Sequence, residues 1–308
     1  MKHILVSGLV NVETTARVRR FPVEYYPIDY PYFGVNTAVS GVGYNIAGAL
    51  TALGDSVTLT SITGQDFPAA YIRQELAEKG ISPHYLKPLM EQTANSVVLY
   101  DETGKRQIYC DLKDIQERAY DFPADICTGV DLVAACNIQF NRPLLHLAKK
   151  AGKPIATDVH VLSRVEDEYN REFMECADIL FLSDEALGED WRSFLWALAE
   201  RYGCAVIVLG RGSRGAAMYV RAENRIYALP AARIGQVVNT VGAGDALFSA
   251  FLHGWAKGCE PLEALIRAEL FAAAKIRVSG AAKGFVSEET LEEFYGRYSG
   301  ALWDALRG

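Results

Sequence analysis

The order of strand-like and helical segments along the chain leaves few folds open. Short runs rich in β-branched residues alternate with helical patterns, and the last third consists of consecutive helical patterns. This alternation is typical of an α/β fold, a largely parallel sheet covered by helices. The predicted strands are Ile4–Val10, Val57–Ile62, Leu132–Cys136, Pro154–Asp158, Ile179–Leu182 and Ala205–Leu209. The predicted helices include Tyr44–Leu53, Pro68–Lys79, Pro143–Ala151, Phe194–Tyr202, Ala243–Lys257 and Pro261–Val278.

Two segments interrupt the alternation. Residues Thr14–Val39 contain three prolines and many Tyr and Val residues, with little helical pattern. Residues Asn95–Cys110 hold two strand-like runs around Glu102-Thr103-Gly104-Lys105, a sequence typical of a β-hairpin. We expect both segments to pair as a small sheet that covers one end of the main sheet. The alternative is a set of edge strands without a role in function.

Composition excludes several classes of protein. The chain has 308 residues, of which 50% are hydrophobic, and no linker or internal repeat divides it, so residues 1–308 are predicted to form a single domain. The 31 basic and 38 acidic residues give a net charge of −7, which argues against a nucleic-acid partner. No apolar stretch approaches the roughly 18 residues that span a bilayer, and the run Ile4–Val10 is too short for a secretion signal. We expect no membrane partner and a cytoplasmic location. The six cysteines lack zinc-ligand spacing and are expected to be buried free thiols.

The most informative segment runs from Asn239 to Leu247 and reads NTVGAGDAL. Two glycines flank an alanine at the start of a predicted helix. A Gly-rich turn that opens a helix leaves backbone N–H groups free, and the helix dipole adds positive partial charge there. Residues Gly242, Ala243 and Gly244 therefore form a candidate anion hole for a phosphoryl group in transfer. The alternative is a turn with no ligand.

Asp245 follows this turn directly and lies in the first turn of the predicted helix. Transfer of a phosphoryl group to a hydroxyl needs a group that accepts the hydroxyl proton at a distance of about 3 Å. A carboxylate beside an anion hole can do this, which makes Asp245 the candidate catalytic base. The alternative is an aspartate that only stabilises a helix N-terminus.

These motifs resemble those of the ribokinase-like sugar kinases, also called the phosphofructokinase B family. The family's carboxy-terminal signature is D-T-x-G-A-G-D, and its amino-terminal signature is a glycine pair followed by an asparagine. The chain has NTVGAGD at 239–245 and SGVGYNIA at 40–47, and GLVNVE at 8–13 resembles the family's first strand. The resemblance covers essentially the whole chain. It implies a three-layer core with a mostly parallel sheet and a small β lid, formed here by about residues 12–39 and 95–111.

The resemblance also implies an ATP-dependent kinase that phosphorylates a hydroxyl of a sugar or sugar derivative, with Mg²⁺ accompanying ATP. Asp245 resembles the catalytic base. The substrate-contacting positions correspond to Asn11, Glu13, Gly41 and Asn45. The family's T-x-G-x-x-G motif on the nucleotide side matches at Gly212 and Gly215, with Gly210 in place of the threonine. A homodimer through the lid is a further family-level expectation.

Two positions depart from the family pattern. Asn239 replaces an aspartate associated with a monovalent-cation site, which puts potassium activation in doubt. The family's N-x-x-E motif corresponds to Ser183-Asp184-Glu185-Ala186. Asp184 or Glu185 can replace the missing glutamate near the nucleotide, and we assign Glu185 to this role.

Three other functions remain open. A nucleoside kinase, such as one for pseudouridine or adenosine, would use the same scaffold, and the aromatic lid residues Tyr25, Tyr26, Tyr30, Tyr32 and Phe33 could stack on a base. A catalytically weak sugar-binding sensor would explain the departures from the motifs. An NAD enzyme would use G-x-G-x-x-G at 210–215, but a strand-like run follows where a helix should open. His160 and Arg106 could meet ligands, although we expect packing to hold His160.

Overall fold

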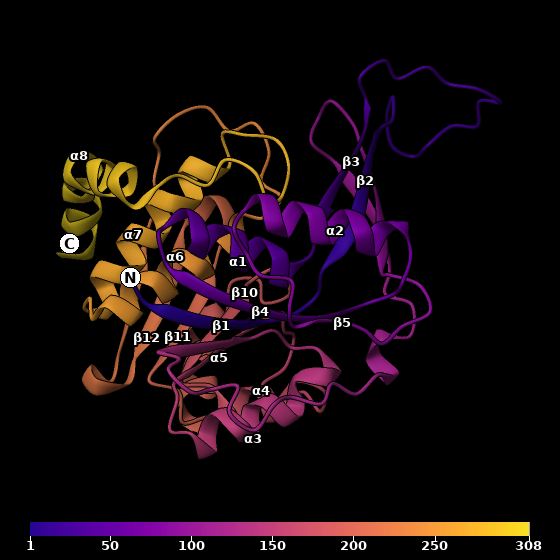
Figure 1. The fold of residues 1–308 in the computed structure, drawn as a ribbon. Coiled ribbons are helices and arrows are strands. Elements are labelled where there is room, and N and C mark those ends of the chain that lie inside the picture. The colour runs from indigo at the N-terminus through magenta and orange to yellow at the C-terminus, as the bar shows by residue number, and fades with distance from the viewer. Residues whose placement is uncertain (308) are drawn as a thin grey trace.

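The computed structural model describes residues 1–307, and its largest element is a nine-stranded sheet with helices on both faces (Figure 1). The strand order is β13-β12-β11-β10-β9-β8-β1-β4-β5. All neighbours from β5 to β11 pair in parallel, and β12 and β13 continue as an antiparallel extension. The strands are β1 (His3–Ser7), β4 (Ser56–Thr63), β5 (Leu86–Pro88), β8 (Leu132–Ala135), β9 (Ile155–Val161), β10 (Ile179–Ser183), β11 (Val206–Gly210), β12 (Ala216–Val220) and β13 (Arg225–Leu229). The predicted α/β class is confirmed.

Helices form the outer two layers (Figure 1). On one face lie α1 (Val42–Ala52), α2 (Phe67–Glu78), α6 (Ala243–Lys257), α7 (Pro261–Lys275) and α8 (Glu288–Arg307). On the other lie α3 (Arg142–Lys150), α4 (Arg171–Cys176) and α5 (Trp191–Arg201). Within residues 1–307, no helix is both long and apolar enough to cross a membrane.

The element boundaries depart from the predictions at two places that matter for the site. The first predicted strand ran to Val10, but β1 ends at Ser7 and a new strand, β2, begins at Asn11 in a different sheet. The helix predicted over Pro261–Val278 is shorter in the structure, where α7 ends at Lys275. The carbonyl of Ile276 instead accepts hydrogen bonds from the N–H groups of Val238 and Asn239. The segment at Val238 and Asn239 thus occupies a carbonyl group that a longer α7 would use for its own hydrogen bonds.

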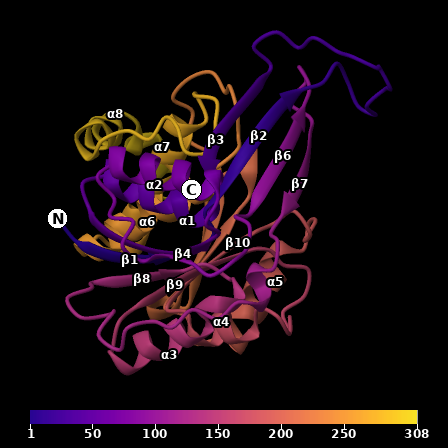
Figure 2. The same ribbon diagram turned by 45° about the vertical axis from the view of Figure 1, so that its right-hand side comes forward.

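The two interrupting segments pair as a four-stranded sheet that extends from the main body (Figure 2). Its order is β3-β2-β6-β7, with strands β2 (Asn11–Arg17), β3 (Val35–Ser40), β6 (Asn95–Tyr100) and β7 (Arg106–Asp111). Strands β6 and β7 are antiparallel neighbours in register, so the predicted hairpin is confirmed. The long β2–β3 connection projects away from the body (Figure 1). Its aromatic side chains are exposed and cover neither sheet; they are Tyr25, Tyr26, Tyr30, Tyr32 and Phe33.

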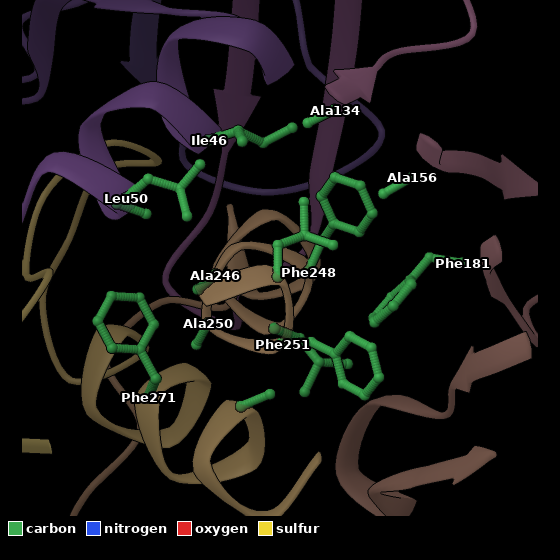
Figure 3. Packing of buried hydrophobic residues seen from close by; sticks show 14 of the residues in the cluster. Ile46, Leu50, Ala134, Ala156, Phe181, Ala246, Phe248, Ala250, Phe251 and Phe271 are labelled. Atoms are coloured by element: carbon green, nitrogen blue, oxygen red, sulfur yellow. The ribbon is translucent and has the colours of Figure 1, made fainter. Parts of the chain in front are cut away.

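Helix α6 is anchored to the sheet by two aromatic side chains. Phe248 and Phe251 project from it toward Phe181 of β10, with ring centroids 5.0 and 5.3 Å away in edge-on geometry (Figure 3). All three rings are at most 3% exposed. Buried aromatic pairs in this geometry contribute stabilisation beyond their buried area. The packing fixes α6 against the sheet and so fixes the position of its first turn.

Candidate active site

The candidate site lies where the carboxyl ends of several parallel strands meet the start of α6. Asn11 follows β1 after a short turn, Asp158 and His160 lie at the end of β9, and Asp184 follows β10. Because parallel strands all end at the same edge of a sheet, residues from four distant parts of the sequence come together there. This edge is where ligands bind in open α/β sheets.

The glycine turn before α6 has a conformation that only glycine adopts easily. Gly242 has φ of 78°, and a Cβ atom there would lie 2.5 Å from the carbonyl oxygen of Ala281. The N–H of Ala243 donates to the carbonyl of Thr240 at 3.2 Å, and the N–H of Ala246 makes the first helical bond, to Gly242. The N–H groups of Gly244 and Asp245 therefore lie in the part of the first turn that lacks helical acceptors. This turn can receive an anion at the positive end of the helix dipole.

Asp245 is held by a residue 200 positions earlier in the chain. The side-chain amide of Asn45 on α1 donates to Oδ2 of Asp245 at 2.6 Å. Burial raises the pKa of Asp245 above that of an ordinary aspartate. The hydrogen bond from Asn45 and the charges of His160 and Lys275 oppose this rise, whereas the charge of Asp158 adds to it. A carboxylate with a raised pKa is a stronger base and still has one oxygen free of Asn45.

The predicted substrate-contacting residues, here called the acceptor side, are Asn11, Glu13, Gly41 and Asn45. Two buried amides among them have oxygen atoms without a hydrogen-bond partner. Asn11 and Asn45 are 3% and 4% exposed, and Oδ1 of each has no hydrogen-bond donor within residues 1–307. The Asn11 side chain donates to Oγ of Ser96 at 2.7 Å, which fixes its orientation. An unsatisfied buried acceptor costs free energy, so such atoms mark places where a ligand donor can bind. Hydroxyl groups are such donors.

Glu13 lies on the same strand as Asn11, on the small sheet. Burial raises its pKa, while a hydrogen bond from Ser40 and the charge of Arg106 lower it. Gly41 precedes α1 with φ of 106°, and a Cβ there would lie 2.5 Å from the carbonyl oxygen of Leu9. The structure therefore brings the predicted substrate residues from β2 and from the start of α1 to one region. Arg106 faces Glu13 closely enough to affect its ionisation.

The predicted nucleotide side, around Glu185, Gly212 and Gly215, is organised differently. Gly212 and Gly215 flank the tight turn that joins β11 to β12. Asp184 is 6% exposed and accepts a hydrogen bond from Arg214 at 2.7 Å, with Nε of Arg211 3.5 Å away. Glu185, the residue assigned to the nucleotide, is exposed. Of the two candidate carboxylates, Asp184 is therefore already neutralised by arginines, and Glu185 is accessible.

Asp158 and His160 form a part of the site that the sequence left unassigned. The backbone N–H of His160 donates to Oδ1 of Asp158 at 2.8 Å, and its Nδ1 lies 3.7 Å from Oδ2. The expectation that packing holds His160 is wrong, because its side chain is 44% exposed. Its φ of 58° is unusual for a residue other than glycine, and such strain clusters at functional sites. In the sequence, the one signal that Asp158 and His160 belong to a site was their position at the carboxyl end of a predicted strand.

The match to a protein-family model agrees with this geometry. The model described as "pfkB family carbohydrate kinase" matches residues 1–288. The chain belongs to this family. As a pfkB-family kinase it is similar to the ribokinase of Arabidopsis thaliana, with 25% identity over 303 residues that cover 90% of this chain and 77% of that protein. It is 26% identical to the acarbose 7(IV)-phosphotransferase of Actinoplanes sp. over 271 residues, 86% of this chain and 88% of that protein.

Solved structures support the same fold. A microbiome-derived acarbose kinase superposes on this pfkB-family kinase with a TM-score of 0.86 at 24% identity, covering 96% of this chain and 99% of that one. The prediction of an ATP-dependent carbohydrate kinase with a ribokinase-like fold is therefore confirmed. Kinases of this family use ATP, typically with a divalent metal.

Proposed function

We propose that this pfkB-family kinase uses Asp245 as the base that activates a hydroxyl of a sugar or sugar derivative for attack on the γ-phosphorus of ATP. The observation that carries the proposal is the part-buried hydrogen bond from Asn45 to Asp245 at the first turn of α6. It ties a residue of the amino-terminal motif to the candidate base beside the glycine turn. In this proposal residues 1–308 act as a single domain, and the small sheet acts as its lid.

Each protein group has a separate task in the proposed reaction. The free carboxylate oxygen of Asp245 accepts the proton of the substrate hydroxyl as the new oxygen–phosphorus bond forms. The bond from the γ-phosphorus to the bridging oxygen breaks, and ADP leaves. Gly242, Ala243 and Gly244 provide the turn whose N–H groups and helix dipole stabilise charge on the transferring group. Most of the rate comes from positioning and electrostatics.

Substrate hydroxyls bind to the acceptor side in this proposal. The unpaired oxygens of Asn11 and Asn45 accept hydrogen bonds from two hydroxyls, and the carboxylate of Glu13 accepts others. Gly41 leaves room for a ring to approach the backbone. The buried acceptors favour a hydroxyl-rich ligand over an apolar one.

ATP would lie on the opposite side, along Gly212 and Gly215, with Glu185 near its phosphates. Within residues 1–307 no group of three or more His, Cys, Asp or Glu side chains is placed to hold a metal ion. Mg²⁺ commonly keeps several waters and binds through substrate phosphates and one or two carboxylates. When bound, Mg²⁺ would neutralise phosphate charge.

Two observations weigh on the alternatives. The exposed aromatic residues of the β2–β3 connection lie on the segment that projects from the body, and none of them is buried in a preformed base pocket. A non-catalytic sensor would not need the Asn45–Asp245 bond or a carboxyl with a raised pKa at the anion hole. We therefore favour a sugar kinase over a nucleoside kinase or a sensor.

We also propose that the chain forms a homodimer through the small sheet. Every residue of β7, one of the two edge strands of this sheet, is exposed, including Ile108 and Tyr109 at 51% and 54%. Exposed edge strands with apolar side chains tend to pair with another chain. Light scattering at several protein concentrations tests this, and a monomer throughout contradicts it.

The decisive experiment on function measures ADP release with Mg·ATP across a panel of hexoses, pentoses, sugar acids, sugar phosphates and nucleosides. We expect release with one class of sugar or sugar derivative, above the background hydrolysis of ATP. A nucleoside as the best acceptor by tenfold or more supports the alternative kinase. No release with any member, from enzyme that melts cooperatively, contradicts the proposed function.

A further inference from the structure

Lys275 is a fully buried cation that lies behind the glycine turn before α6. It is the last residue of α7 and is 0% exposed. Its Nζ donates to the carbonyl oxygen of Gly280 at 2.9 Å. Removing an ammonium group from water is costly unless other groups compensate, so a buried lysine needs an explanation that a surface lysine does not.

The charge of Lys275 is felt at the candidate base. Burial lowers the pKa of Lys275 to about 8, and the negative charge of Asp245 raises it. In return, Lys275 lowers the pKa of Asp245. The two groups therefore interact through the protein interior, where charges act more strongly than in water.

The loop that Lys275 holds is in direct contact with the anion-hole turn. Lys275 binds the carbonyl of Gly280, and the carbonyl of the next residue, Ala281, lies where a Cβ on Gly242 would clash at 2.5 Å. The carbonyl of Ile276 accepts the N–H groups of Val238 at 2.8 Å and Asn239 at 3.0 Å. Residues 276–281 thus form a loop directly behind the glycine turn. Arg277, Val278 and Ser279 of this loop are exposed, and the buried ammonium group of Lys275 lies on its inner side against Gly280.

The segment that leads into the glycine turn has a neutral residue next to the 276–281 loop. Asn239 carries a neutral amide, and its Oδ1 accepts the N–H of Val241 at 2.8 Å. The N–H of Asn239 donates to the carbonyl of Ile276, the residue after Lys275, so an aspartate at this position would bring a negative charge next to this segment. With asparagine, the positive charge remains available to the anion hole.

We propose that the ammonium group of Lys275 is a built-in cation of the phosphoryl-transfer site. It positions the 276–281 loop against Gly242 and supplies a fixed positive charge behind the N–H groups that receive the transferring phosphoryl group. This inference rests on the proposed function of the site. Lys275 is a positioning residue, because Gly280 and Ala281 lie between it and the reacting atoms.

The test is Lys275→Met, which keeps the length and apolar stem of the side chain and removes the charge. We expect kcat to fall about 10- to 100-fold, which is no more than the fall caused by removing a direct anion-hole donor. The KM values for both substrates should stay within threefold of those of the wild type. The melting temperature should not fall, because replacing a buried charge with an apolar side chain is often neutral or stabilising. The matched control is Lys257→Met. Lys257 ends α6 as Lys275 ends α7, but it is exposed and pairs with Glu288, so its loss should leave kcat unchanged.

Two further measurements separate a fixed charge from a packing role. Lys275→Ala should recover at least threefold in kcat with ammonium or methylammonium chloride, but not with tetramethylammonium chloride at equal ionic strength, because only small cations fit the vacated space. By calorimetry, Lys275→Met should weaken binding of ADP with aluminium fluoride at least tenfold and leave binding of ADP alone unchanged, since the complex mimics the transferring group. Wild-type kcat in Lys275→Met, or a loss of kcat with neither rescue nor weaker fluoride binding, overturns the inference.

The wild-type enzyme and Asp245→Asn, assayed in parallel, test the proposed function separately. An active wild type and an inactive Asp245→Asn support the function even if Lys275→Met is unaffected. If no acceptor supports turnover, the proposed function fails, and fluoride binding still decides on Lys275.

Discussion

The two sides of the candidate active site differ in how their polar groups are satisfied. On the acceptor side, Asn11 and Asn45 are almost completely buried and each keeps an unpaired oxygen. On the nucleotide side, the buried carboxylate of Asp184 is already paired with Arg214, and Glu185 is exposed. The acceptor side therefore carries unmet hydrogen-bond acceptors before substrate arrives. On the nucleotide side the buried carboxylate is paired, and the buried group without a partner is a donor, Nε of Arg211.

This difference predicts where mutations act. Loss of an unpaired, buried acceptor removes an interaction that only the substrate can make, so affinity for the sugar should fall strongly. Loss of one exposed or internally paired group on the nucleotide side should cost less, because backbone groups and several charges share the binding of phosphates.

The largest effect is expected at the junction of the two sides. Asp245→Asn keeps the shape of the side chain and removes the proton acceptor, so kcat should fall at least ~100-fold, as expected for a positioned general base. Binding of ATP and of the sugar, measured separately by calorimetry, should change little. Turnover within threefold of wild type rules out Asp245 as the base.

The same carboxyl group predicts a pH dependence. Because burial raises the pKa of Asp245, activity should be lost as pH falls through that raised pKa, at a higher pH than for an ordinary aspartate. Lys275 lowers this pKa, so Lys275→Met should move the acid limb of kcat/KM to still higher pH. The charges of Asp158 and His160 also face the group, and they are the same in both proteins. Profiles from pH 4 to 9 that superpose contradict this coupling.

Glu13→Ala tests the acceptor side at a half-buried carboxylate, which accepts a hydrogen bond from Ser40 and keeps further lone pairs for the substrate. Loss of a charge-assisted hydrogen bond costs about 1.5–3 kcal/mol, so affinity for the sugar should fall roughly ten- to a hundredfold. Affinity for ATP should stay within twofold. Equal weakening of both ligands, measured by calorimetry, would show that the two sides are not separate.

Arg214→Ala tests the nucleotide side. The substitution removes the hydrogen bond to Asp184 and leaves a less neutralised carboxylate near the turn at Gly212. We expect KM for ATP to rise about three- to tenfold from weaker electrostatics, with KM for the sugar unchanged. The exposed Arg225, which lies on the outer strand β13, serves as the control. A larger effect on the sugar than on ATP would reverse the contrast.

Potassium should have the smallest effect. Asn239 is neutral and Lys275 already supplies a buried cation, so turnover in sodium-free buffer should stay within twofold when potassium chloride replaces a bulky organic salt. Asn239→Asp combined with Lys275→Met should become potassium-sensitive, since it exchanges the fixed cation for a carboxylate. Tenfold activation of the wild type would contradict the prediction.

Much of this arrangement could be predicted from local sequence. The alternation of elements predicted the parallel sheet because burial on both faces leaves apolar strand runs separated by helical periodicity. The NTVGAGD segment predicted the glycine turn and the helix start after it, because glycine at a positive φ and a helix start are local properties. The anion-binding role of the turn and the role of Asp245 as base stay predictions. The hairpin at 95–111 followed from its turn residues.

Only the tertiary structure decided which side chains meet. Asn45 reaches Asp245 across 200 residues, and Arg214 neutralises Asp184 from the turn after the next strand. Lys275 lies behind a turn more than thirty residues before it. The sequence marked Asn45 and Asp245 separately, left Asp184 open, and gave no sign that Lys275 would be buried. The reason is physical: periodicity and turn preferences depend on neighbours in the chain, whereas the energy of a buried charge depends on partners that folding brings together.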